Sequence, residues 1–488
     1  MISKYLQEQR RYSQEDLCNI FECTEEKAVS IIKRLKSFGI LKTVGISDVQ
    51  KEMSELADED VIISDVNEGD NTCYYVFTYV GIITIAGRVL KCYPKYIAKN
   101  TEPRKELQQI IKVLQKYNSK EQIVYLFNDN GEKHTFNLLA VMLSLLNDYY
   151  ENGIYTNTEE IIESNGSGEI LWDKTINETF TILYNNRPYY ADLLTKKRVN
   201  DDYDFFKRLH ECVLSRFTKE LEAADLLDIF GILPVELSDE KLSDFGDKEY
   251  LLYRIENELS VQFNTRKQMI LKTIYAYLAN QGTLNDINEF SLFGTNSFNL
   301  VWEKVCAEVL DNQLNTRLGD LQLSVPLDKS YKGTDTLISL IEKPKWNGVA
   351  ENGEFFVKEA NDTLIPDLIS IYKDQTQCDF IIFDAKYYRM TLEVNRKISG
   401  QPGISDVTKQ YLYQLAYRKF IEAHKIANVK NCFLMPTEED IIVNKGYANM
   451  DMLDALGLQH IQIRLLPAKM MYEHYLKGTK LDIALLCL

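Results

Sequence analysis

Ile365-Pro366-Asp367-Leu368-Ile369 and, a short way downstream, Phe383-Asp384-Ala385-Lys386-Tyr387-Tyr388 are the stretches that decide how the last third of this chain folds. Each sets charged residues in an apolar, β-prone run, and the polar residues 373–378 between them predict a turn. A hairpin centred on residues 375 and 376 would place Asp367 directly opposite Asp384, with both side chains on one face. The strand period of two would place Lys386 on that face as well. Two carboxylates and one ammonium group are therefore expected to converge.

This combination of side chains suits a divalent cation and a phosphate group. Mg²⁺ prefers carboxylate and water oxygens, and it usually takes one or two protein carboxylates together with substrate phosphate. Without a cation, two facing carboxylates would repel and the pKa of one would rise. A nearby lysine could hold or protonate the attacking water, or stabilise charge in the transition state. We expect Mg²⁺ as the cofactor, with Mn²⁺ as a substitute; the alternative is an edge hairpin whose acids merely face solvent.

These residues resemble the motif of the PD-(D/E)XK nuclease superfamily, with Asp367 and Asp384 as its acids and Lys386 as its lysine. Residues 298–306 are similar to the first helix of that fold, which often supplies a further acid. The resemblance implies that Glu303, or Glu308 in its place, is this acid and joins the two aspartates at the metal.

A second helix is expected over residues 406–417, where Asp406 at the start suits a helix N-terminus. It resembles the helix after the catalytic strand in many such nucleases. The resemblance implies that Lys409 contacts DNA phosphate and that Gln410 orients the catalytic lysine. The tyrosines of this helix are interpreted as core residues.

Two upstream stretches narrow the resemblance. Residues 79–96 resemble the N-terminal β segment of McrC-like proteins, and residues 170–177 with 186–190 are similar to LlaJI-type restriction endonucleases. The resemblance spans about residues 75–440. It implies a Mg²⁺-dependent endonuclease subunit that cuts double-stranded DNA when a separate AAA+ GTPase of the McrB type activates it, in an oligomer with the GTPase ring. The chain has no G-x-x-x-x-G-K-[ST] motif, so any motor is expected to be another protein.

Composition limits the remaining function classes. The chain has 488 residues, of which 45% are hydrophobic and 26% charged, as in ordinary soluble proteins of several domains. Its net charge of −16 argues against nonspecific DNA coating. Residues 384–434 hold nine Lys or Arg against four Asp or Glu, a net charge of +5 that suits either DNA contact or a solvated helix face. Scattered cysteines and the lack of a signal peptide or apolar span predict a cytoplasmic protein with no membrane contact.

The N-terminal residues predict a DNA-binding or protein-binding module. Residues 1 to about 50 are interpreted as helices with a turn, followed by a strand that begins near residue 40. This order resembles a winged helix, whose second helix would carry Lys33, Arg34 and Lys36 into a DNA groove. Because winged helices also bind proteins, an alternative function stays open: a DNA-binding or adaptor protein with a structural nuclease-like domain.

The predicted fold class is multidomain α+β with four consecutive parts. Residues 1–70 form a winged-helix-like module with an acidic linker, and residues 71–101 form a β segment, interpreted as an McrC-like region that docks on the partner. Residues 102–284 form a helical middle domain. Residues 285–488 form an α/β PD-(D/E)XK nuclease domain with a mixed central sheet.

Overall fold

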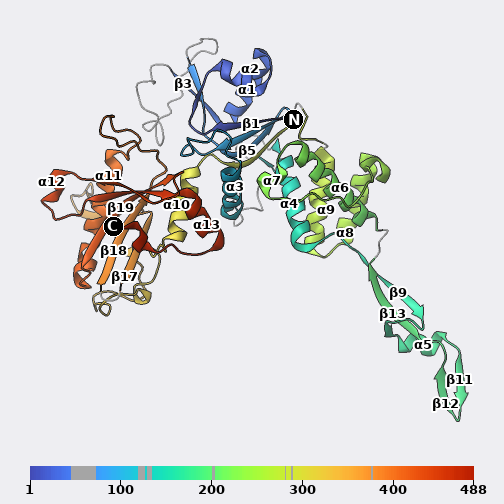
Figure 1. Ribbon diagram of the computed structural model, residues 1–488. Helices are drawn as coiled ribbons and strands as arrows, with labels where there is room; N and C mark the ends of the chain where they lie inside the picture. The colour runs from blue at the N-terminus through green and yellow to red at the C-terminus, as the bar shows by residue number, and fades with distance from the viewer. Residues whose placement is uncertain are drawn as a thin grey trace. The chain divides into compact units, whose positions relative to one another are not determined.

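A computed structural model describes residues 1–45, 73–118, 127–128, 135–200, 204–280, 282–286, 289–374 and 377–488 (Figure 1). The predicted acidic linker lies outside these residues. The turn predicted over residues 373–378 is too long, because 373–374 and 377–378 pair as strands, and residues 375 and 376 lie outside the described ranges. Contacts divide the chain into two units. The first contains Met1, Thr84–Gly87 and Tyr125–Leu292, and the second contains Ile2–Ile83, Arg88–Val124 and Phe293–Leu488. The architecture is a multidomain mixture of helices and mixed sheets, as the sequence predicted. Of the helices described, none has the length and apolar character that crossing a bilayer requires.

A mixed five-stranded sheet organises the C-terminal part of the second unit. Its first pair is antiparallel, the next two pairs are parallel and the last pair is antiparallel. The apolar runs at residues 431–436 and 460–466 predict core strands, and these runs form two of the three mutually parallel strands at its centre. In spatial order the strands are β17 (Leu368–Asp374), β18 (Gln377–Ala385), β19 (Asn428–Thr437), β21 (Ile461–Pro467) and β20 (Val443–Ala448).

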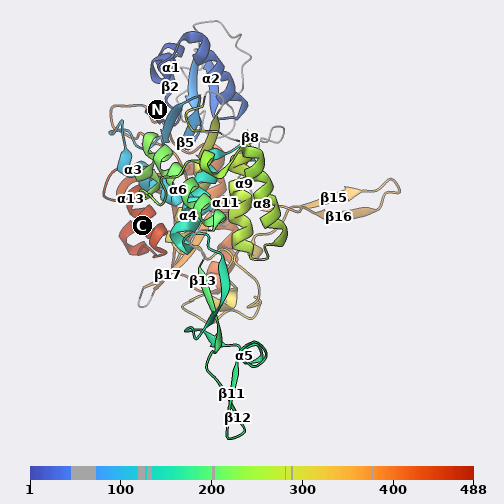
Figure 2. The same ribbon diagram turned by 90° about the vertical axis from the view of Figure 1, so that its right-hand side faces the viewer.

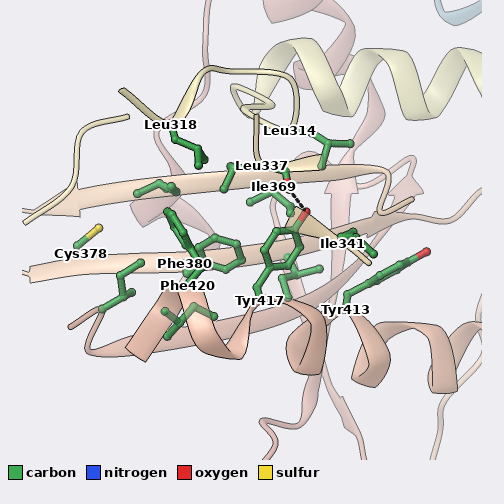
Figure 3. Packing of buried hydrophobic residues seen from close by; sticks show 14 residues of the cluster. Leu314, Leu318, Leu337, Ile341, Ile369, Cys378, Phe380, Tyr413, Tyr417 and Phe420 are labelled. Atoms are coloured by element: carbon green, nitrogen blue, oxygen red, sulfur yellow. Dashed lines mark hydrogen bonds between the residues drawn. The ribbon is translucent and has the colours of Figure 1, made fainter. Parts of the chain in front are cut away.

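Helix α11 (Ile404–Ala423) covers one face of this sheet, because its apolar side chains fill the space over β17 and β18. Figure 3 shows Tyr417 and Phe420 pointing from the helix toward Phe380 on β18, with Leu337 on the far side. The Tyr417 hydroxyl donates to the Leu337 carbonyl oxygen at 3.1 Å. The core of this domain therefore lies between α11, the sheet and the loop that follows α10.

Helix α10 (Phe298–Val309), predicted as the first helix of the domain, packs on the opposite face. Ser370 alternates along β17 with residues of the α11 face, and its hydroxyl donates to the Leu310 carbonyl oxygen just beyond α10 at 2.6 Å. Trp302 is fully buried, and its Nε1 donates to the Leu434 carbonyl oxygen on β19 at 3.2 Å. Helix α13 (Ala468–Lys477) packs beside α10 and against α3 (Arg104–Asn118).

A second sheet has the order β1 (Ile2–Gln7), β6 (Arg88–Tyr93), β5 (Val80–Ile85) and β14 (Phe290–Thr295). The prediction of helices from residue 1 onward is wrong here, because Ile2–Gln7 pairs in parallel with β6 over its whole length. A long-range partner, absent from the local pattern, determines this strand. Gly81 has a φ of 141°, and a Cβ atom there would lie 2.1 Å from the Phe293 carbonyl oxygen, so only glycine fits.

The predicted helix–turn–helix is confirmed as α1 (Gln14–Phe21) and α2 (Glu25–Ser37). The Ser13 side chain accepts from the Asp16 backbone N at 3.0 Å, and Asp16 accepts from the Ser13 N at 2.9 Å, as in a capping box. A three-stranded antiparallel sheet follows the helices, in the order β2 (Arg11–Tyr12), β4 (Cys73–Phe77) and β3 (Leu41–Gly45). Strand β4 therefore pairs with the N-terminal module, although the sequence analysis grouped it with the following β segment.

Helices dominate the first unit, as predicted, with a β insertion between them. The helices are α4 (Leu138–Asn152), α6 (Phe205–Ala223), α7 (Leu227–Phe230), α8 (Lys248–Val261) and α9 (Thr265–Asn280). Within residues 158–200 the helical prediction is wrong, because β9 (Thr158–Ser164) pairs with β13 (Leu194–Asn200) as an antiparallel ribbon. Residues 158–200 contain many β-branched and aromatic side chains, which favour strands although helices precede and follow this segment. Figures 1 and 2 show this insertion, which we call the arm, extending from the helices.

The arm ends in a second hairpin beyond a short helix. Its further elements are β10 (Glu169–Ile170), α5 (Trp172–Glu178), β11 (Thr181–Tyr184) and β12 (Arg187–Tyr190). Outside the arm, further short elements are β7 (Phe127–Asn128), β8 (Thr135–Phe136), β15 (Lys345–Val349), β16 (Phe355–Glu359), α12 (Asp451–Asp454) and the 3-10 helices Leu242–Phe245, Leu318–Asp320, Ile338–Leu340 and Ile483–Leu486.

Candidate active site

The predicted pair of aspartates meets where β17 begins and β18 ends. Leu368 pairs with Phe383, and the same register continued by one residue sets Asp367 opposite Asp384, which confirms the predicted hairpin alignment. The Asp367 Oδ2 accepts a hydrogen bond from the Ala385 backbone N at 2.8 Å. This bond holds the first carboxylate against the end of the second strand. Asp384 is buried, with 6% of its surface exposed.

Lys386 lies beside Asp384, as its position two residues further along the chain predicted. Its Nζ lies 3.4 Å from the Asp384 Oδ1 and 3.0 Å from the Asp406 Oδ1. Its backbone N donates to the Leu434 carbonyl oxygen at 2.9 Å, so the chain after β18 stays attached to β19. The lysine therefore bridges two carboxylates that come from different elements.

Asp406 is a member of this site that the sequence analysis interpreted only as a helix-start residue. It lies in the first turn of α11, and its Oδ2 accepts from the Gly403 backbone N at 3.2 Å. Its other oxygen is thereby aimed at Lys386. The loop between β18 and α11 brings the two together, and no periodic sequence pattern marks that approach.

The electrostatics of the site follow from this crowding of charge. Burial raises the pKa of Asp384 well above its usual range, and the hydrogen bond and negative charge of Asp367 raise it further. Burial acts to lower the pKa of Lys386, but the charges of Asp384 and Asp406 outweigh it and the lysine pKa rises. The Asp384 carboxyl thus ionises less readily than an ordinary aspartate. A cation between the carboxylates would favour its ionised form.

The approach to Asp367 is held by two residues that the sequence analysis did not assign to the site. The Asn312 Nδ2 donates to the Asp367 carbonyl oxygen at 3.1 Å, and its Oδ1 accepts from the Ile369 N at 3.1 Å. The Tyr413 hydroxyl, from α11, donates to the Ile365 carbonyl oxygen at 2.9 Å. Tyr413 is buried, as predicted for a core tyrosine, yet it also fixes the segment that carries the first acid.

Of the two glutamates considered for the upstream acid, Glu303 is the better placed. It is half-buried on α10, one turn before the buried Cys306. Burial raises the pKa of Cys306, and the charges of Asp367 and Glu303 raise it further, so both carboxylates act on the same thiol. Glu308 instead forms an ion pair with Lys304, with 3.1 Å between the Lys304 Nζ and the Glu308 Oε1.

The donor set fits Mg²⁺ with an open coordination sphere. Asp367 and Asp384 supply carboxylate oxygens, and Mg²⁺ commonly completes its shell with water and substrate phosphate. Across the described ranges, no three His, Cys, Asp or Glu side chains gather closely enough to form a full protein cage.

Helix α11 carries the other two residues that the nuclease resemblance implied. Gln410 is fully buried one turn after Asp406, and neither its side-chain N nor its side-chain O has a hydrogen-bond partner among the described residues. A buried amide without partners is unfavourable, so this group suits contact with a further ligand or water. Lys409 is exposed on the same helix.

The predicted DNA-binding residues of the helix–turn–helix lie on α2, an element separate from the strands that carry the acids. Lys33 is exposed, while Arg34 and Lys36 are half-buried. They occupy the last turns of the helix, and Ile32 and Leu35 face its core. The structure therefore presents two distinct groups of predicted functional residues.

Comparison with known proteins places the chain in a family. It matches the LlaJI restriction endonuclease family over residues 79–468. The "Type II restriction enzyme BsuMI component YdjA" of Bacillus subtilis (strain 168) is 24% identical over 422 residues, which cover 84% of this chain and 82% of that protein.

Two solved structures of the Thermococcus gammatolerans McrBC system were also matched. A chain of the refined half-complex from the tetradecameric assembly of McrB AAA+ hexamers with bound McrC shows 12% identity and a TM-score of 0.34, over 98% of this chain and 99% of that one. A chain of the McrBC complex shows 13% identity and a TM-score of 0.24, over 62% of this chain and 85% of that one. The family match spans most of the sequence, and the chain therefore belongs to the LlaJI restriction endonuclease family.

Proposed function

We propose that this chain is the DNA-cutting subunit of a restriction system, a metal-dependent endonuclease with a PD-(D/E)XK site. The observation that carries the proposal is the meeting of Asp367 and Asp384 at facing ends of β17 and β18, with Lys386 beside them. Membership of a restriction endonuclease family supports the same reading. The substrate would be the phosphodiester backbone of double-stranded DNA.

Each residue of the site has a distinct task in this proposal. Asp367 and Asp384 would hold Mg²⁺ or Mn²⁺, and the bound ion supplies a more acidic water and neutralises charge on the phosphate. Lys386, held by Asp384 and Asp406, presents a positive charge to the phosphate as negative charge develops there. Gln410 would orient the lysine, Glu303 would act as the further acid, and Lys409 would contact the DNA backbone.

The proposed activator is a separate AAA+ GTPase of the McrB type. The chain has no P-loop motif, and its relative in Bacillus subtilis is described as one component of an enzyme, so a partner subunit is consistent with both. The predicted docking segment has few side chains to offer, because β5 is entirely buried and β6 almost entirely so. Binding of a partner protein requires side chains that are exposed on the surface.

The arm offers such a surface. Large apolar side chains on α5 and the terminal hairpin are exposed, and such patches commonly mark protein-interaction sites. They are Trp172, Ile176, Phe180, Ile182, Leu183, Tyr184 and Tyr189. We include this surface in the proposal as the place where the GTPase binds.

Replacing Phe180, Leu183 and Tyr184 by Ser should abolish partner-dependent cutting while leaving thermal unfolding within about 1 °C, because exposed side chains contribute little to stability. These residues are 80%, 73% and 66% exposed. Asp173→Ser on α5 is the matched control and should cut normally. Normal partner-dependent cutting by the triple variant would remove the arm from the proposal.

The winged-helix interpretation of the N-terminal module also belongs to this proposal. Helices α1 and α2 followed by the β2-β4-β3 sheet suit such a module. Its Lys33, Arg34 and Lys36 would face DNA.

Purified protein, mixed with the GTPase, GTP and DNA, tests the central proposal. We expect cleavage with Mg²⁺ or Mn²⁺ and none with a chelator in excess. Equal cleavage without the GTPase would show a nuclease that acts alone. Metal-independent DNA binding with no cleavage under any condition would favour the adaptor alternative, in which the helix–turn–helix carries the function.

A further inference from the structure

A buried cluster connects the N-terminal sheet to the residue that follows Lys386. Glu8, just after β1, is 5% exposed, and its Oε2 accepts a hydrogen bond from the Tyr387 hydroxyl at 2.5 Å. The same oxygen accepts from the Lys95 backbone N at 3.2 Å. Glu8 and Tyr387 are 379 positions apart in the sequence, yet they share one buried hydrogen-bond network.

The segment after β6 completes this network. The Lys95 ammonium lies 4.7 Å from the centre of the Tyr387 ring and 5.7 Å from that of Tyr388. The Tyr96 ring packs edge-on against Tyr387 at 6.3 Å, and the Gln7 side chain donates to the Lys95 and Ile97 carbonyl oxygens. Both the end of β1 and the end of β6 therefore hold this tyrosine.

Three further contacts attach the same segment to the residues just after β19. The backbone N groups of Ala98 and Lys99 donate to the Glu438 carboxylate at 2.9 and 3.0 Å, and the Lys99 Nζ lies 2.6 Å from the Glu439 Oε1. Strand β19 pairs with β18 at Asp384 and Ala385. The N-terminal sheet is thus fastened to both strands beside the candidate active site.

The buried carboxyl depends on its partners. Burial raises the pKa of Glu8, against the opposing effects of the Lys95 charge and the Tyr387 hydroxyl. A buried carboxyl without such partners would be strongly unfavourable. Burial of the Glu8 carboxyl therefore costs folding free energy, which indicates that its hydrogen bond to Tyr387 has a role in the candidate active site.

We propose that Glu8 is a positioning residue for DNA cleavage, because it holds Tyr387 and so fixes the main chain that carries Lys386. This inference rests on the proposed nuclease function and adds to it a physical connection from the N-terminal sheet to the catalytic lysine. Displacement of a reacting group by about 1 Å commonly costs about a hundredfold in rate. Release of Tyr387 should therefore lower the rate of cutting more than the affinity for DNA.

The test compares Glu8→Ala, Tyr387→Phe and the double variant in the full chain with its GTPase partner. Each single variant should lower kcat about tenfold to a hundredfold with KM for DNA unchanged within about twofold. The double variant should be no slower than the slower single variant, because both remove one interaction. Glu8→Gln keeps an acceptor for the tyrosine and should restore most of the rate.

Tyr96→Phe is the matched control. It removes the hydrogen bond between the Tyr96 and Tyr472 hydroxyls, 3.2 Å apart in the same buried cluster, but leaves Tyr387 bonded to Glu8. It should cut within about threefold of the parent. An equal loss of kcat in this control, or multiplicative losses in the double variant, would overturn the proposal.

Hydrogen exchange separates failure of this inference from failure of the nuclease function. The Lys386 amide, which is bonded to the Leu434 carbonyl oxygen, should exchange faster in Glu8→Ala and at the parental rate in Tyr96→Phe, whether or not DNA is cut. Unchanged exchange at residues 386–390 in Glu8→Ala would contradict the positioning role directly. Absence of cutting by the parent protein would count against the nuclease function alone.

Discussion

Asp384→Asn is expected to abolish DNA cutting and to raise the thermal stability of the metal-free protein. In the parent chain, burial and the neighbouring Asp367 disfavour the ionised form of Asp384, so its pKa is raised. An asparagine removes that buried charge, and its amide can donate to Asp367. The same change removes a metal ligand, so cutting should fall to background.

The pH dependence of this effect has a definite sign. A carboxyl whose pKa is higher in the folded than in the unfolded state binds more protons when folded, so the free energy of unfolding falls as pH rises. For Asp384 this loss begins near the unfolded value of about 3.9 and is complete above the folded pKa. The Tm of Asp384→Asn should therefore exceed that of the parent chain most at high pH, by on the order of 2 °C or more, and should equal it near pH 3.

Thermal unfolding at pH 3 to 9, with and without Mg²⁺, measures this prediction. Mg²⁺ should raise the Tm of the parent chain, because ligand that binds only the folded state stabilises it, and should not raise that of Asp384→Asn. A lower Tm for the metal-free variant at high pH would contradict the electrostatic account of this site. Retained DNA cutting by Asp384→Asn would show that Asp384 is not a metal ligand.

Lys386→Ala is expected to reduce the cutting rate by about a thousandfold, comparable with the loss of one preorganised group that stabilises transition-state charge. DNA affinity should change little, because the lysine is only 21% exposed and is engaged by two carboxylates. Removing it leaves Asp384 and Asp406 without their shared cation. The metal-free protein should therefore also lose stability.

Lys430→Ala separates chemistry from stability. Lys430 on β19 forms an ion pair with Asp379, with 2.9 Å between the Lys430 Nζ and the Asp379 Oδ2, and it is half-buried like Lys386. Its loss should lower stability by a similar amount and leave cutting within about threefold of the parent. Equal loss of cutting in both variants would mean that Lys386 supports the fold of the domain and has no part in the chemistry.

Local sequence patterns predicted the central pair of this site. Two apolar, β-prone runs on either side of a short polar segment predict a hairpin, and centring that hairpin on residues 375 and 376 sets Asp367 opposite Asp384. The same reasoning placed Lys386 beside them. Helix α11 was predicted from the acid at its N-terminus and from the nuclease resemblance, and the central strands were predicted from their apolar runs.

Patterns of short range failed where a distant segment decided the structure. Strand β1 forms only because β6, more than 80 positions later, offers a partner edge. The arm lies between helices, and its strands pair with each other across an insertion of their own.

By itself, the amino-acid sequence determined the chemistry available to this protein: which acids and which lysine share a strand face, and that no P-loop accompanies them. Two strands joined by a short turn can pair in only a few registers, so the sequence alone predicts which of their side chains lie together. Only the tertiary structure decided that Asp406 holds the lysine and that Glu8 holds Tyr387. Such contacts depend on how separately formed helices and strands pack against each other, and this packing produces no repeating pattern in the amino-acid sequence.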